Sequence, residues 1–141
     1  MPNRPCRLRG FDYRGFHSYF LTICTNRRRP VFSDLTFGYV ARDQLLQRAR
    51  VRYFALLAYC LMPDHVHILA QGQTSTASLR PFINGWNTWT GREWRKAHRS
   101  PLWQGGYYDH VLRDSESFLG AARYIVMNPV RAGLVQRSED Y

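Results

Sequence analysis

Lysine is almost absent from this 141-residue sequence, which carries nineteen arginines and a single lysine, Lys96. The net charge of +10 is therefore carried by guanidinium groups. A planar guanidinium donates two parallel hydrogen bonds to phosphate oxygens, which an ammonium group cannot do. A surface made only for solubility needs no such preference, although a GC-rich genome also favours arginine codons. The charge favours nucleic acid as the partner.

Cysteine is scarce as well, and its spacing excludes two classes of small protein. No two of Cys6, Cys24 and Cys60 form a C-x-x-C pair. The sequence therefore indicates neither a zinc ribbon nor a disulfide framework. Cys24 and Cys60 lie in apolar runs and are expected to be buried free thiols.

Long hydrophobic runs are missing too. The longest, residues 54–62, is far shorter than the ~20 residues that span a bilayer, and residues 1–5 lack the apolar stretch of a signal peptide. No membrane partner and a cytoplasmic location are expected. There is no repeat, linker or low-complexity tract, and 45% of the residues are hydrophobic. We expect one domain over residues 1–141.

Hydrophobic periodicity predicts four strands and three helices. In chain order these are a strand at 17–25, a helix at 34–50, strands at 52–62 and 65–70, a helix at 78–98, a strand at 107–113 and a helix at 115–127. Asp114 or Ser115 is the expected cap of the last helix, and Asn128-Pro129 its stop. The fold class is α+β: a ferredoxin-like βαββαβ antiparallel sheet with an additional C-terminal helix. Its first and third strands are expected to be central.

The second helix combines a core stripe with candidate nucleic-acid contacts. Its core residues fall at helical spacing: Leu79, Phe82, Ile83, Trp86 and Trp89. Trp94 and Trp103 are then left over. They alternate with Arg92 and Arg95, a pattern that suits stacking on unpaired bases.

His65-Val66-His67 opens the third predicted strand. Strand alternation places both imidazoles on one face with Leu69, and Val66 on the other face with Ile68. Two adjacent imidazoles weaken an apolar face unless something bonds them, and a divalent metal does so. The spacing is weak evidence in isolation. One core histidine and one surface histidine would produce the same pattern.

The last predicted helix offers a nucleophile. Tyr124 falls at the edge of its buried face, which comprises Phe118, Ala121, Ala122 and Ile125. Asn128 lies one turn further along the same side. A phenol has a pKa of ~10 and is a poor nucleophile, but a metal that polarises a phosphate makes it useful. The alternative is a boundary tyrosine and an asparagine that only ends the helix.

Three ordered blocks carry a resemblance to a known family. They are MPDHVHIL (62–69), LWQGGYYDHVLRD (102–114) and YIVMNPVRAGLV (124–135). With the opening RGFDYRGFHSYFLTICTNRRRPVF, they look like the REP-associated tyrosine transposases, within the HUH single-tyrosine transposase superfamily. The likeness covers nearly the whole chain.

The resemblance implies a ferredoxin-like fold that binds single-stranded DNA with hairpin elements and uses Mg²⁺ or Mn²⁺. It implies His65 and His67 as metal ligands, Asn128 as a further ligand and Tyr124 as the catalytic nucleophile. The implied reaction cleaves and rejoins DNA beside a hairpin through a 5′-phosphotyrosine and a free 3′-hydroxyl. A bacterial, nucleoid-associated location follows. Some relatives are homodimers that exchange the tyrosine helix and others act alone, so a homodimer stays open.

Further residues complete the candidate site. Arg27, Arg28 and Arg29 are expected to follow phosphates, and Arg123 and Arg131 flank the nucleophile as further DNA contacts. His110 is a candidate accessory residue that bonds a phosphate or assists proton transfer. Tyr107 and Tyr108 are rival nucleophiles, although a strand directs them to opposite faces, as expected of packing residues.

Two other functions remain open at this stage. A catalytically inactive relative would bind hairpins without cutting them, with salt-sensitive affinity. A metal hydrolase would use a bound water in place of the tyrosine. The spacing of Tyr124 and Asn128 disfavours the hydrolase.

Overall fold

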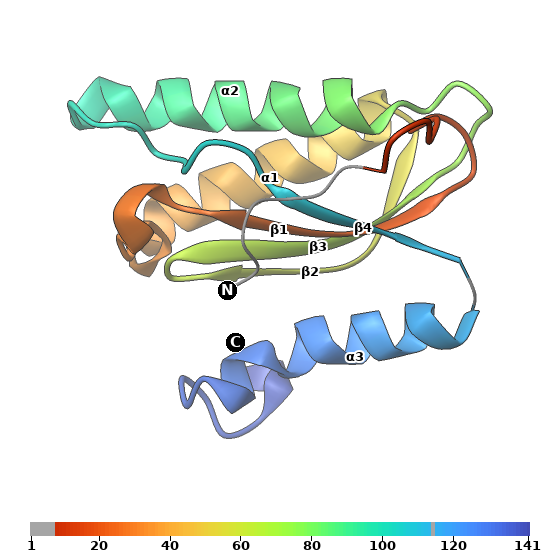
Figure 1. The fold of residues 1–141 in the computed structure, drawn as a ribbon. Helices are drawn as coiled ribbons and strands as arrows, with labels where there is room; N and C mark the ends of the chain where they lie inside the picture. Colours follow the sequence, from red (N-terminus) through yellow and green to blue (C-terminus); the bar gives the residue numbers. More distant parts are fainter. Residues whose placement is uncertain (1–7, 114) are drawn as a thin grey trace.

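A computed structural model describes residues 8–113 and 115–141 of the chain. Its helices and strands follow the predicted order (Figure 1). They are β1 (Ser18–Cys24), α1 (Leu35–Val51), β2 (Phe54–Met62), β3 (His65–Gly72), α2 (Leu79–Ala97), β4 (Tyr108–Leu112) and α3 (Ser115–Arg131). Asp34 caps α1 through its side chain, which accepts a hydrogen bond from the Phe37 amide at 3.2 Å. Asp114 and Cys6 lie outside the described residues.

The four strands form one antiparallel sheet in the order β2-β3-β1-β4. As predicted, β1 and β3 are central and β2 and β3 form a hairpin. Helices α1 and α2 cover one face of the sheet, and α3 lies against the other (Figure 1). This arrangement confirms the α+β, ferredoxin-like fold class. None of the described helices combines the length and apolar content needed to cross a membrane.

The hydrophobic core is divided by the sheet into two unequal clusters. The larger lies between the sheet and α1 and α2. The smaller holds α3 to the sheet and consists of Cys60, Met62, Leu69 and Ile125. Ile125 is fully buried, which contributes about 1.5–3 kcal/mol. The predicted apolar face of α3 is confirmed, because Phe118, Ala121 and Ala122 pack beside this cluster.

Helix α3 does not end where the sequence predicted. Asn128-Pro129 was expected to stop it after Met127, but it continues to Arg131 with Pro129 inside. Proline disfavours helical backbone in the preceding residue. Here both Asn128 and Pro129 are buried, and the Ala132 amide donates to the Asn128 carbonyl at 3.0 Å. Tertiary packing therefore outweighs the local preference.

Two tryptophans of α2 differ in burial from what the sequence predicted. Trp89 was expected in the core, but it is only half-buried. Trp94 was expected to stack on bases, but it is 9% exposed and belongs to the core. The buried residues of α2 include Leu79, Ile83, Trp86, Thr90 and Trp94. The centre of this face lies near Leu79 and Thr90, so Trp94 falls inside it and Trp89 at its edge.

Candidate active site

The two histidines lie on the face of β3 that α3 covers. His65 and His67 share this face with Leu69, which packs in the smaller cluster. Val66 and Ile68 point into the larger cluster. The predicted alternation is thereby confirmed. The imidazole centroids of His65 and His67 are 4.7 Å apart, so both rings can contact a single ion.

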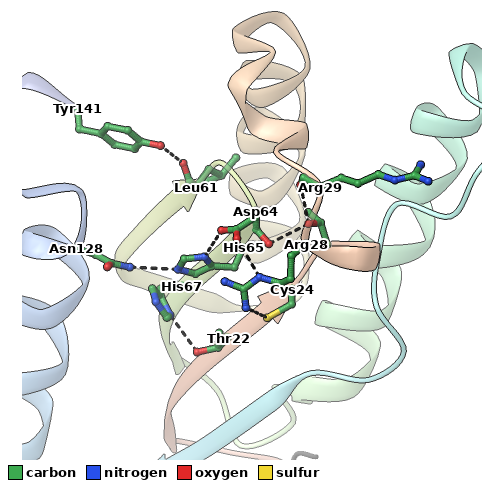
Figure 2. A network of polar contacts seen from close by, with 11 residues as sticks. Thr22, Cys24, Arg28, Arg29, Leu61, Asp64, His65, His67, Asn128 and Tyr141 are labelled. Carbon is green, nitrogen blue, oxygen red and sulfur yellow. Dashed lines mark hydrogen bonds and ion pairs between the residues drawn. The ribbon is translucent and has the colours of Figure 1, made fainter. Parts of the chain in front are cut away.

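Asp64 orients the ring of His65. Its carboxylate oxygen accepts a hydrogen bond from His65 Nδ1 at 2.8 Å, and a second oxygen accepts one from Arg28 Nε at 3.0 Å (Figure 2). Burial alone would raise the pKa of Asp64, but these two donors hold it below its usual value. A carboxylate accepts only, so His65 Nδ1 donates this bond, and in a neutral imidazole the lone pair then lies on Nε2.

Thr22 on β1 orients the ring of His67. The Thr22 hydroxyl lies 3.0 Å from His67 Nδ1 (Figure 2), because the two residues are directly paired across β1 and β3. Burial, followed by the nearby His65, lowers the pKa of His67 to about 4. His67 is therefore neutral at pH 7, which is the form that binds a metal.

Helix α3 brings Asn128 and Tyr124 to the same place. Asn128 is 8% exposed, and its side-chain amide donates to His65 Nε2 at 3.3 Å (Figure 2). The Tyr124 ring lies 5.5 Å from that of His67 and 6.0 Å from that of Phe20, edge-on to both. Tyr124 is 47% exposed. It thus packs through its ring while remaining open to a ligand, as the sequence predicted.

Arg131 contacts Tyr124 from the end of the same helix. Its guanidinium lies over the Tyr124 ring, 4.0 Å from the centroid. It also donates a hydrogen bond to the Tyr124 carbonyl. Residues seven apart share a helix face, so this contact depends on the continuation of α3 through Pro129.

One cavity of about 790 Å³ collects most of these side chains. Arg28 enters it from the turn after β1, where Arg27 and Arg28 adopt left-handed backbone. The lining residues are Phe20, Thr22, Arg28, His65, His67, Tyr108, His110, Leu112, Ala121, Tyr124 and Asn128. The predicted nucleophile, metal ligands and accessory His110 therefore meet in one place.

The donor set of this cavity fits a divalent ion. Two imidazoles have their Nδ1 atoms engaged, which leaves both Nε2 atoms for a ligand. Asn128 already contacts one of these nitrogens, and rotation of its amide presents oxygen in place of nitrogen. Within the described residues, no cluster of three or more His, Cys, Asp or Glu side chains suited to a metal ion occurs. The Asn128 amide oxygen is therefore available as a third protein ligand.

Other predicted contacts lie away from the cavity. Arg92 and Arg95 line a separate groove of about 400 Å³ beside Trp103, and α2 is on the opposite face of the sheet (Figure 1). Arg27 and Arg123 are exposed, and Arg29 donates to the Ser100 hydroxyl at 2.9 Å. Because Trp94 is buried, it is no longer a candidate DNA contact. Cys24, expected to be buried, is half-buried on the cavity side of β1 and accepts a hydrogen bond from Arg28.

Three residues of the candidate site were assigned no role from the sequence. Asp64 stood inside the MPDHVHIL block without an assigned role, and Phe20 and Thr22 were treated only as strand formers. Period-two alternation places Phe20 and Thr22 on one face of β1, but only the register shows that this face is the one that carries His67. Of the rival nucleophiles, Tyr107 is buried in the core, whereas Tyr108 lines the cavity.

Comparisons with known proteins identify the family of the chain. The family model described as "Transposase IS200 like" matches residues 16–128, a span that contains both histidines, Tyr124 and Asn128. The REP-associated tyrosine transposase of Escherichia coli K12 is 24% identical over 92% of this chain and 79% of its own. An uncharacterized Haemophilus influenzae protein is 24% identical over 90% of this chain and 88% of its own.

A solved structure confirms the fold. The REP-associated tyrosine transposase bound to a REP hairpin superimposes with a TM-score of 0.80. The match covers 96% of this chain and 79% of the other, at 20% sequence identity. The matching family model defines the protein as a transposase. The chain belongs to the IS200-like transposase family, and its resemblance to the REP-associated members is confirmed.

Proposed function

We propose that this transposase cuts and rejoins single-stranded DNA through a covalent bond to Tyr124, with Mg²⁺ or Mn²⁺ held by His65, His67 and Asn128. The observation that carries the proposal is the convergence of these four side chains, from β3 and α3, on one cavity. Asp64 and Thr22 fix the two imidazole rings, as outer partners do for metal-bound histidines.

The proposed step is a transesterification. The Tyr124 hydroxyl oxygen bonds to the phosphorus, and the bond from phosphorus to the 3′ oxygen breaks. The phenol loses one proton and the 3′ oxygen gains one, so the products are a 5′-phosphotyrosine and a free 3′-hydroxyl. Reversal by another 3′-hydroxyl rejoins DNA without ATP, because the phosphotyrosine ester keeps the energy of the broken phosphodiester. A bound divalent ion would polarise the phosphate and offset its charge.

The proposed substrate is a DNA hairpin with single-stranded flanks. A similar fold has been solved with a REP hairpin bound, and this chain carries a net charge of +10. Arg28 lies in the cavity and Arg131 beside it, where phosphates of the cut strand would pass. Arg27, Arg29, Arg92, Arg95 and Arg123 are proposed to hold the backbone further away. Such a substrate implies action at the bacterial nucleoid.

The test is a denaturant-resistant adduct. The purified chain is incubated with Mn²⁺ and hairpin oligonucleotides taken from imperfect palindromes that flank its gene, and the products are run on a denaturing gel. Wild type is expected to form the adduct and Tyr124→Phe to lose it. Tyr108→Phe is the matched control, because it removes the other phenol of the cavity and should retain the adduct.

Each of the other outcomes contradicts a different part of the proposal. An adduct that persists in Tyr124→Phe overturns the assigned nucleophile. Salt-sensitive hairpin binding without an adduct under any metal identifies a non-catalytic binding relative. Cleavage that survives Tyr124→Phe without a covalent intermediate identifies a metal hydrolase.

A further inference from the structure

The cavity extends well beyond the residues of the proposed reaction. The strand registers place His67, Thr22 and Tyr108 in one row across β3, β1 and β4. The next row consists of Leu69, Phe20 and His110. Both rows face α3, because their neighbours Tyr19, Leu21 and Val111 point into the larger core cluster. The β4 side of the cavity therefore continues directly from the histidine pair.

This β4 side differs in chemistry from the rest of the cavity. Around the histidines the lining is polar, with Arg28 and Asn128. On the β4 side it is formed by Phe20, Tyr108, His110, Leu112 and Ala121. In the proposed reaction, a divalent ion and the scissile phosphate occupy the polar part of the cavity. They leave the aromatic part of a cavity of about 790 Å³ without a role, and cavities of this size hold molecules well beyond a phosphate.

The aromatic side chains are open to a ligand. His110 is exposed, and Tyr108 and Phe20 are half-buried. Within residues 8–113 and 115–141, neither the Tyr108 hydroxyl nor the His110 ring has a hydrogen-bond partner. Flat aromatic rings with free polar atoms are the surfaces on which unpaired bases stack and bond.

We propose that Phe20, Tyr108 and His110 form a nucleobase subsite, which seats a base next to the phosphate that Tyr124 attacks. The proposal rests on the proposed function, since it names part of the same substrate. Phe20 links the two sites, because its ring lies 5.4 Å from that of His67 and 6.0 Å from that of Tyr124. A base on Phe20 thus belongs to a nucleotide adjoining the scissile phosphate.

Binding of two probes with the same number of phosphates tests the subsite. One is an oligothymidylate of eight nucleotides, and the other is the same backbone with abasic tetrahydrofuran units. Their equal charge keeps the electrostatic part of the affinity equal. The dissociation constants are measured in Mn²⁺ for wild type, Tyr108→Leu and Tyr39→Leu. Tyr39 is the matched control, an exposed tyrosine of α1 on the opposite face of the sheet.

Wild type and Tyr39→Leu are expected to prefer the oligothymidylate over the abasic probe. Tyr108→Leu is expected to reduce that preference about tenfold while leaving the affinity for the abasic probe unchanged. Tyr108→Phe, which keeps the ring, should retain most of the preference. An equal preference in Tyr108→Leu and wild type overturns the subsite. Adduct formation is measured separately. If wild type forms no adduct but its base preference depends on Tyr108, the proposed function is rejected and the subsite stands.

Discussion

The guanidinium of Arg131 lies 4.0 Å from the centroid of the Tyr124 ring, and it also donates to the Tyr124 carbonyl. The guanidinium thus contacts both the ring and the backbone of the proposed nucleophile. The contact exists because α3 continues past Asn128-Pro129. An apparent helix stop thus contributes to the site, since the extra turn returns Arg131 to the face of Tyr124.

Replacing Arg131 by Met is expected to slow adduct formation roughly 2- to 30-fold, the range that a cation–π contact of 0.5–2 kcal/mol supplies. The slower rate constant of adduct formation should be seen even at saturating DNA. Arg123→Met, an exposed change on the same helix, should alter only DNA affinity. Equal rate constants for the two variants would show that Arg131 serves as one more phosphate contact.

Asp64→Asn is expected to weaken Mn²⁺ binding by about 10- to 100-fold, because loss of an outer carboxylate frees the ring and lowers the basicity of a metal-bound histidine. Isothermal titration calorimetry of the DNA-free protein measures this directly. Asp43→Asn removes an exposed carboxylate that pairs with its neighbour Arg42, and should leave metal affinity unchanged. If Asp64→Asn also binds Mn²⁺ normally, Asp64 does not support a metal site.

Tyr124 is expected to act with the histidines of its own chain, because one copy brings Tyr124, His65 and His67 into the same cavity. Mixing Tyr124→Phe with His67→Ala should therefore restore no adduct. The mixture is compared with each variant alone and with wild type at the same total concentration. Restored activity in the mixture alone would mean that two copies exchange α3 in a homodimer.

Trp94→Ala is expected to lower the free energy of unfolding by about 3 kcal/mol, as for other buried tryptophans. Its neighbour Arg95 is exposed, so Arg95→Gln should change stability by less than about 0.5 kcal/mol and weaken DNA binding at low salt. Urea denaturation and hairpin titration separate the two effects. Weaker hairpin binding by fully folded Trp94→Ala would restore the base-stacking role.

The sequence predicted the parts of this site that depend on short-range geometry. Strand alternation placed His65 and His67 on one face, and helical spacing placed Tyr124 beside Asn128. The antiparallel sheet followed from the order of the elements. The first two relations span only a few residues, so periodicity determines them.

The features that the sequence did not predict depend on tertiary structure. Pairing of Thr22 with His67 and Tyr108 is a matter of strand register, which no local pattern specifies. The burial of Trp94 depends on the phase of α2 against α1 and the sheet. Helix α3 continues through Pro129 because Asn128 and Pro129 pack inside, which local propensity cannot anticipate.

The most direct test of the account is the site at which DNA is attached. Trypsin cleaves after Arg123 and Arg131, so residues 124–131 form a peptide with one tyrosine. Tyr107 and Tyr108 fall in a different peptide, residues 100–113. After nuclease trimming of the adduct formed in Mn²⁺, mass spectrometry is predicted to find the nucleotide on residues 124–131. A nucleotide on residues 100–113 would contradict the central claim that Tyr124 is the nucleophile.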